Sequence, residues 1–140
     1  MKKTLILKND LSEIEGLAKT IVDFGKENNL SDKVIYDINL ALEEVVSNII
    51  FYGYEDNSEH RIIIHFDLRD KELILRVTDD AKPFNPQEVP EPDIGKPIEE
   101  RQIGGLGIYF VRNLMDKVEY KREQGKNILV MKKEIIKGAA

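Results

Sequence analysis

The chain has 140 residues, of which 41% are hydrophobic and 34% are charged, and its formal net charge is −5. This composition excludes a collagen, a mucin-like stalk and a disordered tail. Acidic and basic residues are mixed along the chain and cysteine is absent, so neither the basic face of a nucleic-acid-binding protein nor a disulfide or thiolate site is expected.

A short strand and two helices are predicted first. Thr4–Lys8 is expected to form the strand. Asp10 and Glu13 have the spacing of a capping box, in which Asp10 accepts from the backbone and Glu13 reaches back. The helix behind them is predicted to end at about Asn28. Ser31 is a second good N-cap, and the apolar spacing after it predicts a helix that ends near Gly53.

The hydrophobic period then changes from helix to strand. Apolar residues alternate over residues 62–68 and again over residues 73–77, with a turn at residues 69–71, which predicts two strands. All five prolines lie in the window from Pro83 to Pro97, where neither a helix nor a central strand is expected. A loop of this length is typically a functional lid or a disordered segment.

A third helix and two more strands are predicted to close the chain. Apolar spacing from Ile108 to Val118 predicts the helix, and residues around 118–123 and 127–132 are expected to form strands joined by a turn at Gln124 and Gly125. Three helices and an antiparallel meander whose apolar face they can cover make an α+β two-layer sandwich.

Two polar features break the apolar pattern of these elements. Glu44 and Asn48 are spaced i,i+4 on one face of the second helix; they are either solvated surface residues or a carboxylate base beside an amide ligand for Mg²⁺. Counting by twos places Asp79 on the apolar face of its strand, where a carboxylate is costly unless something donates to it. Asp79 either turns into solvent at the strand end or accepts from a ligand such as the amine of adenine.

Glycines cluster directly before the third helix, at Gly104, Gly105 and Gly107. They form either a flexible hinge or a phosphate site at a helix start, where free N–H groups and the positive end of the dipole meet. Arg101 belongs to a charged stretch that is usually solvated, but it is near enough to the glycines to reach a phosphate. His60 and His65 are expected to be surface residues.

Together, these features resemble the motifs of the GHKL ATPases (gyrase, heat-shock chaperone, histidine kinase and MutL). Leu42–Ile50 resembles the N box, Thr78–Pro86 the first glycine box and Gly104–Val111 the second. The resemblance covers nearly the whole chain and implies a Bergerat-type ATP-binding fold, in which a mostly antiparallel sheet is covered on one face by three helices. The small size and the Pro-Phe-Asn-Pro segment are similar to the bacterial anti-sigma-factor serine/threonine kinases.

The resemblance implies a domain plan: residues 1–136 form a single histidine-kinase-like ATPase domain, residues from about 83 to 103 a proline-rich ATP lid, and residues 137–140 a tail. It also implies roles for the site. Glu44 would be the general base, Asn48 would coordinate Mg²⁺ that bridges the ATP phosphates, and Asp79 would accept from the adenine amine. The remaining nucleotide contacts would come from Phe84, Arg101, Gly104, Gly105, Leu106 and Gly107.

The partners that the resemblance implies are a STAS-domain anti-sigma antagonist, which would be phosphorylated on serine or threonine, and a sigma factor, with a homodimer possible. No nucleic acid or membrane is expected to be a partner. The longest uncharged run, Val45 to Tyr54, is about half a membrane span, and the apolar stretch at Leu5–Leu7 is too short for a signal peptide. A cytoplasmic protein is therefore expected.

One departure from the family pattern leaves a second function open. Ala81 stands where the first glycine box usually has glycine. If that position requires a positive φ, alanine costs on the order of 1 kcal/mol. The alternative is then a non-catalytic or weakly nucleotide-binding module that sequesters a sigma factor. A third hypothesis, the detached catalytic domain of a sensor histidine kinase, is disfavoured because no phosphoacceptor-histidine helix is found.

Overall fold

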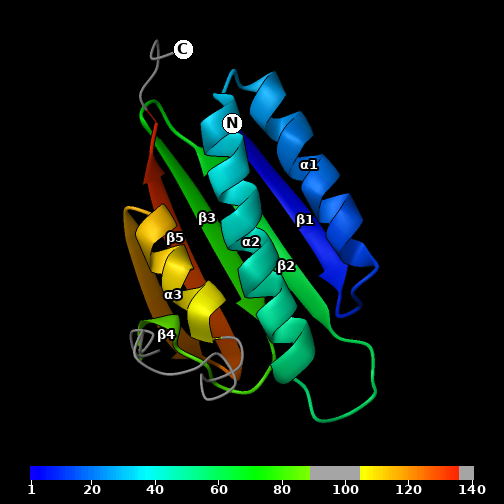
Figure 1. Ribbon diagram of the computed structural model, residues 1–140. Helices are drawn as coiled ribbons and strands as arrows, with labels where there is room; N and C mark the ends of the chain where they lie inside the picture. Colours follow the sequence, from blue (N-terminus) through cyan, green and yellow to red (C-terminus); the bar gives the residue numbers. More distant parts are fainter. Residues whose placement is uncertain (89–104, 136–140) are drawn as a thin grey trace.

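One antiparallel sheet and one layer of helices make up the fold in the computed structural model, which describes residues 1–88 and 105–135. The strands are β1 (Lys2–Lys8), β2 (Arg61–Leu68), β3 (Glu72–Asp79), β4 (Lys117–Glu123) and β5 (Lys126–Glu134). The helices are α1 (Glu13–Glu27), α2 (Asp32–Tyr52) and α3 (Gly105–Leu114), with a 3₁₀ helix at Pro86–Glu88. The helices cover one face of the sheet, with α2 between α1 and α3 (Figure 1). The predicted α+β sandwich is confirmed.

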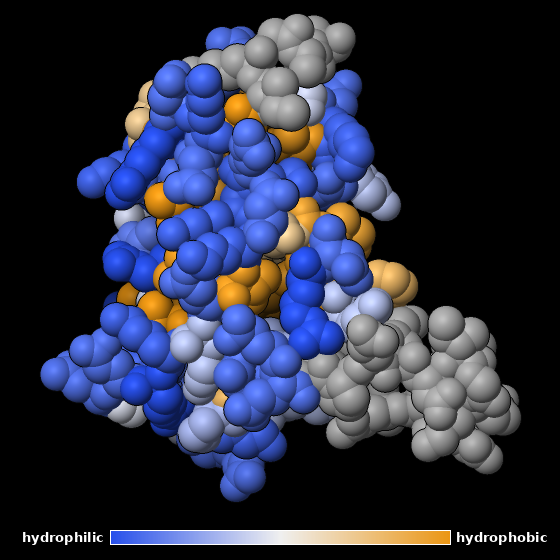
Figure 2. Space-filling view, turned by 90° about the vertical axis from the view of Figure 1, so that its left-hand side faces the viewer, coloured by the Kyte–Doolittle hydropathy of each residue, from blue (hydrophilic) through white to orange (hydrophobic). Residues whose placement is uncertain are grey.

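The strand order differs from the predicted meander. The sheet runs β1-β2-β3-β5-β4, so β5 pairs with β3 and β4 lies at the edge. Composition explains the exchange: β4 has the sequence KVEYKRE and is mostly exposed, whereas β5 has a run of apolar residues. A charged strand is suited to an edge and an apolar strand to the centre of a sheet. Figure 2 views the molecule from the side of the edge strand β4. Hydrophilic residues cover most of this side, with hydrophobic patches between them.

Both ends of α2 and the C-terminal end of α1 agree with the sequence, whereas the start of α1 differs. Ser31 Oγ accepts from Val34 N at 3.2 Å, and α2 ends at the predicted Gly53. The capping box at Asp10 is wrong: Asp10 accepts from Ser12 N within a tight turn, and Glu13 reaches back to Lys8 N. Because this local turn satisfies Asp10, α1 begins only at Glu13.

The core lies between the helices and one face of the sheet. The alternation predicted for β2 and β3 is present, since the side chains facing the helices are almost fully buried. Phe66 of β2 packs against Phe24 of α1, with ring centroids 5.1 Å apart. The turn between β4 and β5 lies at the predicted Gln124 and Gly125, which both have positive φ. Among the described residues, no helix is long and apolar enough to cross a membrane.

Residues 83–88 of the expected lid are described, whereas its residues 89–103 and the expected tail, residues 137–140, lie outside the described part of the chain. Arg101 and Gly104 also lie outside it.

Candidate functional site

A pocket opens where the C-terminal half of α2 meets the end of β3 and the start of α3. Three of the predicted nucleotide-contact residues, Asn48, Asp79 and Phe84, line this pocket. Asn48 is half-buried and Phe84 is exposed. The apolar part of the wall comes from α2, β3, α3 and β5: Val45, Ile49, Val77, Ile108 and Leu129. An apolar wall with a few converging polar groups is typical of a site for a small organic ligand.

Asp79 is the buried carboxylate of this pocket. It ends β3 on the face that the helices cover, as the counting by twos predicted, and it is only 5% exposed. Its Oδ1 accepts from Ala81 N at 3.0 Å and from Asn127 Nδ2 at 2.9 Å. Burial raises the pKa of Asp79, and these two hydrogen bonds oppose that rise because they favour the charged form. Within the described residues, no hydrogen bond reaches its second oxygen, Oδ2.

Asn127 is a pocket residue that the sequence reasoning missed. It is 5% exposed and lies directly opposite Asp79 in the pairing of β3 with β5. Its amide also donates to the carbonyl oxygens of Ala81 and Lys82, at 3.3 and 2.9 Å. The signal was present, because counting by twos back from Leu129 puts Asn127 on the apolar face of β5, just as it does Asp79 on β3.

Ala81 fits without the strain that the family comparison suggested. It is buried and is not among the residues with positive φ. Its methyl group packs against the backbone at Gly53, where an added Cβ would lie only 2.7 Å from Ala81 Cβ. Lys82 N donates to Gly53 O at 3.0 Å. The glycine at the end of α2 thus leaves room for the alanine after β3.

Glu44 does not line the pocket but lies beside it, against the first turn of α3. A Cβ placed on Gly107 would be 2.8 Å from Glu44 Cδ and closer still to Oε2, so only glycine leaves room for this carboxylate. Gly105 begins α3, which puts Gly105, Leu106 and Gly107 in the first helical turn rather than before the helix. The first N–H groups of a helix have no partner within the helix and can bind phosphate.

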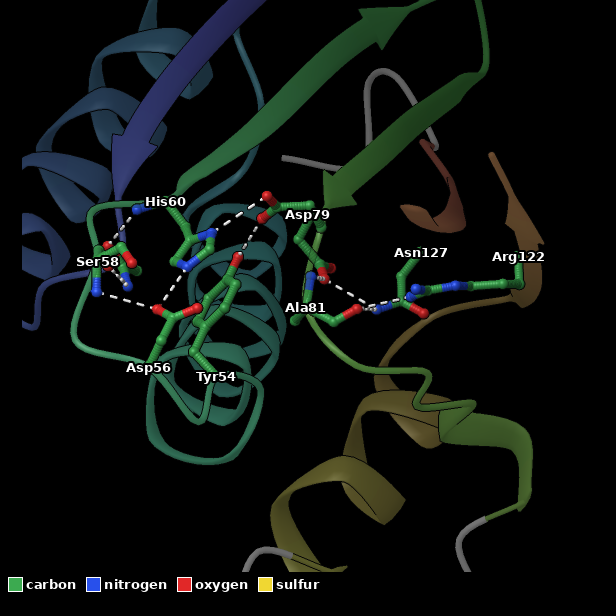
Figure 3. A network of polar contacts seen from close by, with 10 residues as sticks. Tyr54, Asp56, Ser58, His60, Asp79, Ala81, Arg122 and Asn127 are labelled. Carbon is green, nitrogen blue, oxygen red and sulfur yellow. Dashed lines mark hydrogen bonds and ion pairs between the residues drawn. The ribbon is translucent and has the colours of Figure 1, made fainter. Parts of the chain in front are cut away.

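Asp80, the residue after β3, belongs to a second polar network, of which Figure 3 labels Tyr54, Asp56 and His60. It accepts from Tyr54 OH at 3.0 Å, and His60 Nδ1 lies 3.1 Å from Asp80 Oδ2. His60 Nε2 lies 2.8 Å from Asp56 Oδ1, and the His60 ring stacks on Tyr54 with centroids 4.1 Å apart. His60 was expected at the surface, and the structure places it there as a partly covered residue, with a side chain that is 18% exposed.

Asp56 and Tyr54 are near His60 in sequence, but Asp80 lies 20 residues away, so no local pattern could reveal the whole network. Hydrogen bonds to Asp56 and Asp80 raise the pKa of His60. Burial opposes ionisation of Asp80, but hydrogen bonds from His60 and Tyr54 hold its pKa below the ordinary value. His65 lies on the open face of the sheet, beside Thr4.

The residues present fit an adenine nucleotide and a phosphate-bound magnesium ion. Asp79 Oδ2 can accept from an exocyclic amine, and the apolar wall can pack against the base. Among the described residues, no group of three His, Cys, Asp or Glu side chains could hold a metal. Asn48 has an amide oxygen that could hold magnesium together with the phosphates, because this ion commonly has few protein ligands.

Comparisons with known proteins show the family of this chain. A family model described as a histidine kinase-like ATPase domain matches residues 7–133. The chain is similar to the serine-protein kinase RsbW of Listeria monocytogenes, with 26% identity over 106 residues, 73% of this chain and 68% of the relative. It is also similar to RsbW of Bacillus mycoides, with 31% identity over 100 residues, 69% of this chain and 62% of the relative.

A solved structure of RsbU and RsbW domains from Mycobacterium tuberculosis has the same fold. It superposes with a TM-score of 0.70 and 14% identity, and the match covers 96% of this chain and 32% of that one. The chain thus spans about a third of that structure and about two thirds of the curated relatives.

Proposed function

Since the chain belongs to the family of histidine kinase-like ATPase domains, we propose that it is a Mg-ATP-dependent serine/threonine kinase that acts on a small regulatory protein. The proposed substrate is a STAS-domain anti-sigma antagonist, and the proposed second partner is a sigma factor. Similarity to relatives named serine-protein kinase RsbW supports a kinase of the anti-sigma type. The proposed location is the cytoplasm, where such partners act.

The observation that carries this proposal is the placement of three groups around one pocket. Asp79 and Asn48 line it, and Glu44 lies one helical turn before Asn48, against Gly107 of α3. A nucleotide with its base at Asp79 and its phosphates at the first turn of α3 would pass Asn48 and bring its γ-phosphate toward Glu44. Phosphoryl transfer needs positioning and charge neutralisation more than covalent chemistry.

In the proposed reaction, Glu44 accepts the proton of a serine or threonine hydroxyl on the partner. The hydroxyl oxygen forms a bond to the γ-phosphorus, the bond between that phosphorus and the β–γ bridging oxygen breaks, and ADP leaves. Asn48 would hold magnesium together with the phosphates, and the ion would supply charge neutralisation there. The N–H groups of the first α3 turn hold phosphate oxygens, and the apolar wall keeps water from the base.

The alternative of a non-catalytic binding module loses its main support from the sequence. That support was the alanine in the first glycine box, and Ala81 has no positive φ to strain it. The binding module remains an outcome of the test below.

Transfer of labelled γ-phosphate to STAS-domain proteins of the same genome tests the proposal. We expect label on serine or threonine of one of them, dependent on magnesium and lost in Glu44→Gln. Glu43→Gln is the matched control, because Glu43 is the exposed neighbour of Glu44 on α2 and this variant should retain transfer. Full transfer by Glu44→Gln would refute the role of Glu44, and partner binding without nucleotide would favour the binding module.

A further inference from the structure

Three polar side chains form a row across neighbouring strands beside the pocket. Arg122 of β4 is paired with Asn127 of β5, which is in turn paired with Asp79 of β3. Arg122 Nη1 donates to Ala81 O at 2.6 Å, and Tyr120, on the same face of β4, donates from its hydroxyl to Asn127 Oδ1 at 2.5 Å. The hairpin of β4 and β5 therefore holds both Asp79 and the chain that follows it (Figure 3).

The orientation of the Asn127 amide is fixed by the chemistry of its neighbours. Its nitrogen faces three acceptors, which are Asp79 Oδ1 and the carbonyl oxygens of Ala81 and Lys82, while its oxygen faces the Tyr120 hydroxyl. The flipped amide would put its oxygen against three acceptors, which is unfavourable. The Asn127 amide nitrogen therefore donates to Asp79 Oδ1 in a fixed orientation.

This donor decides which Asp79 oxygen remains for a ligand. Oδ1 already accepts from Ala81 N and Asn127 Nδ2, so Oδ2 is the oxygen left to meet a base. An ionised carboxylate can only accept, and it therefore matches the 6-amino group of a purine and repels a 6-oxo group. If Asp79 took up a proton, the proton would sit on Oδ2, which would then donate and lose this preference.

We propose that Asn127, oriented by Tyr120, is a positioning residue that fixes the Asp79 carboxylate and so selects 6-amino over 6-oxo purine nucleotides. This inference rests on the proposed nucleotide binding at the pocket. It assigns a role to the β4–β5 hairpin, which none of the sequence motifs includes.

The charged surroundings of Asp79 allow the role to be read from a pH profile. Asp80 beside it raises its pKa, Arg122 from β4 lowers it, and Tyr54 faces it from the segment after α2. His60 titrates next to Asp80, so the titration of Asp79 is obtained from the difference between variant and wild type. Without the hydrogen bond from Asn127, burial raises the pKa of Asp79 further. As the pH falls, nucleotide binding should therefore be lost at a higher pH in the variant than in wild type.

The test is calorimetric binding of ATP and GTP between pH 5 and 8 by wild type, Asn127→Leu, Asn127→Thr and Tyr120→Phe. We expect Asn127→Leu to lower ATP affinity at pH 7 by about tenfold, to bring the ATP-to-GTP ratio toward one, and to move the pH midpoint of binding upward. Asn127→Thr keeps one hydroxyl donor and should recover part of the ratio. Tyr120→Phe, which removes a single hydroxyl, should reduce the ratio without unfolding the protein.

Lys121→Ala is the matched control, because Lys121 is the exposed neighbour of Tyr120 and Arg122 on β4 and alternates to the other face of the strand. It should leave the pH midpoint and the ATP-to-GTP ratio unchanged. Equal losses for both nucleotides, with no shift of the midpoint in Asn127→Leu or Tyr120→Phe, would overturn the inference. Wild-type protein that discriminates ATP from GTP through Asn127 but transfers no phosphate would refute the proposed kinase alone; wild-type protein that binds no nucleotide would refute both.

Discussion

Because Glu44 lies close to Gly107, the variant Gly107→Ala should change stability and activity in different ways. The added methyl group would lie 2.8 Å from Glu44 Cδ, against 3.4–4 Å for ordinary van der Waals contact. The atoms it meets are the far end of a flexible side chain, so the carboxylate can swing away while the backbone stays in place. The displacement needed at the carboxylate is about 1 Å or more.

Gly107→Ala is expected to preserve or slightly raise the thermal stability and to lower the rate of phosphoryl transfer. Alanine is favoured over glycine inside a helix by about 0.5–1 kcal/mol, which offsets the rotation of Glu44, so the melting temperature should stay unchanged or rise slightly. A misplacement of about 1 Å in a catalytic group can cost about 100-fold in rate. Phosphoryl transfer should therefore fall by about that factor, while the affinity for ATP changes little.

Single-turnover phosphoryl transfer to the STAS-domain partner, measured beside thermal unfolding, checks both effects. Gly16→Ala is the control, since Gly16 lies in α1 with nothing within 4 Å of an added Cβ. It should stabilise the protein and leave transfer unchanged. A Gly107→Ala variant that transfers phosphate at the wild-type rate would refute the idea that Glu44 acts from its place against α3.

Two further predictions concern the residues around the end of β3. Ala81→Gly should lower the free energy of unfolding by about 0.5–1 kcal/mol with nearly unchanged ATP affinity, because no positive φ is relieved; chemical denaturation and calorimetry check this, and a gain in stability would contradict it. Protonated His60 donates to Asp56 and Asp80, and its pKa is raised, so wild type should exceed His60→Gln in thermal stability below about pH 6.5. That excess should be lost as the pH rises through the raised pKa. Burial lowers the pKa of His65. In the control His65→Gln, the stability that wild type gains from His65 should therefore be present above about pH 6.5 and decline as the pH falls. A His60→Gln difference that does not change with pH would refute the charged network.

Periodicity predicted the elements well because it reports which side of each element is buried. The alternation that located β2 and β3 also placed Asp79 in the core, and Ser31 marked the start of α2 correctly. Asp10 misled because two local hydrogen-bonding patterns compete for the same side chain, and the turn to Ser12 prevailed over the helix cap.

Pairing between distant strands was not available from local patterns. The β4–β5 turn was predicted correctly, but placing β5 beside β3 required weighing the charged edge strand against the apolar one. Without that order, Asn127 had no visible partner, although its place on the apolar face was detectable. The contacts of His60 with Asp80, 20 residues away, depend on how the segment after α2 folds back, which no spacing rule describes.

The most direct test of the nucleotide site is calorimetric titration of the protein with ATP, with and without magnesium, beside Asn48→Ala. Micromolar affinity that requires magnesium and is weakened in Asn48→Ala is the predicted result. Asn113→Ala, an exposed asparagine near the other end of α3, should bind like wild type. Absence of ATP binding, or binding that ignores both magnesium and Asn48, would contradict a Mg-ATP site between α2, β3 and α3.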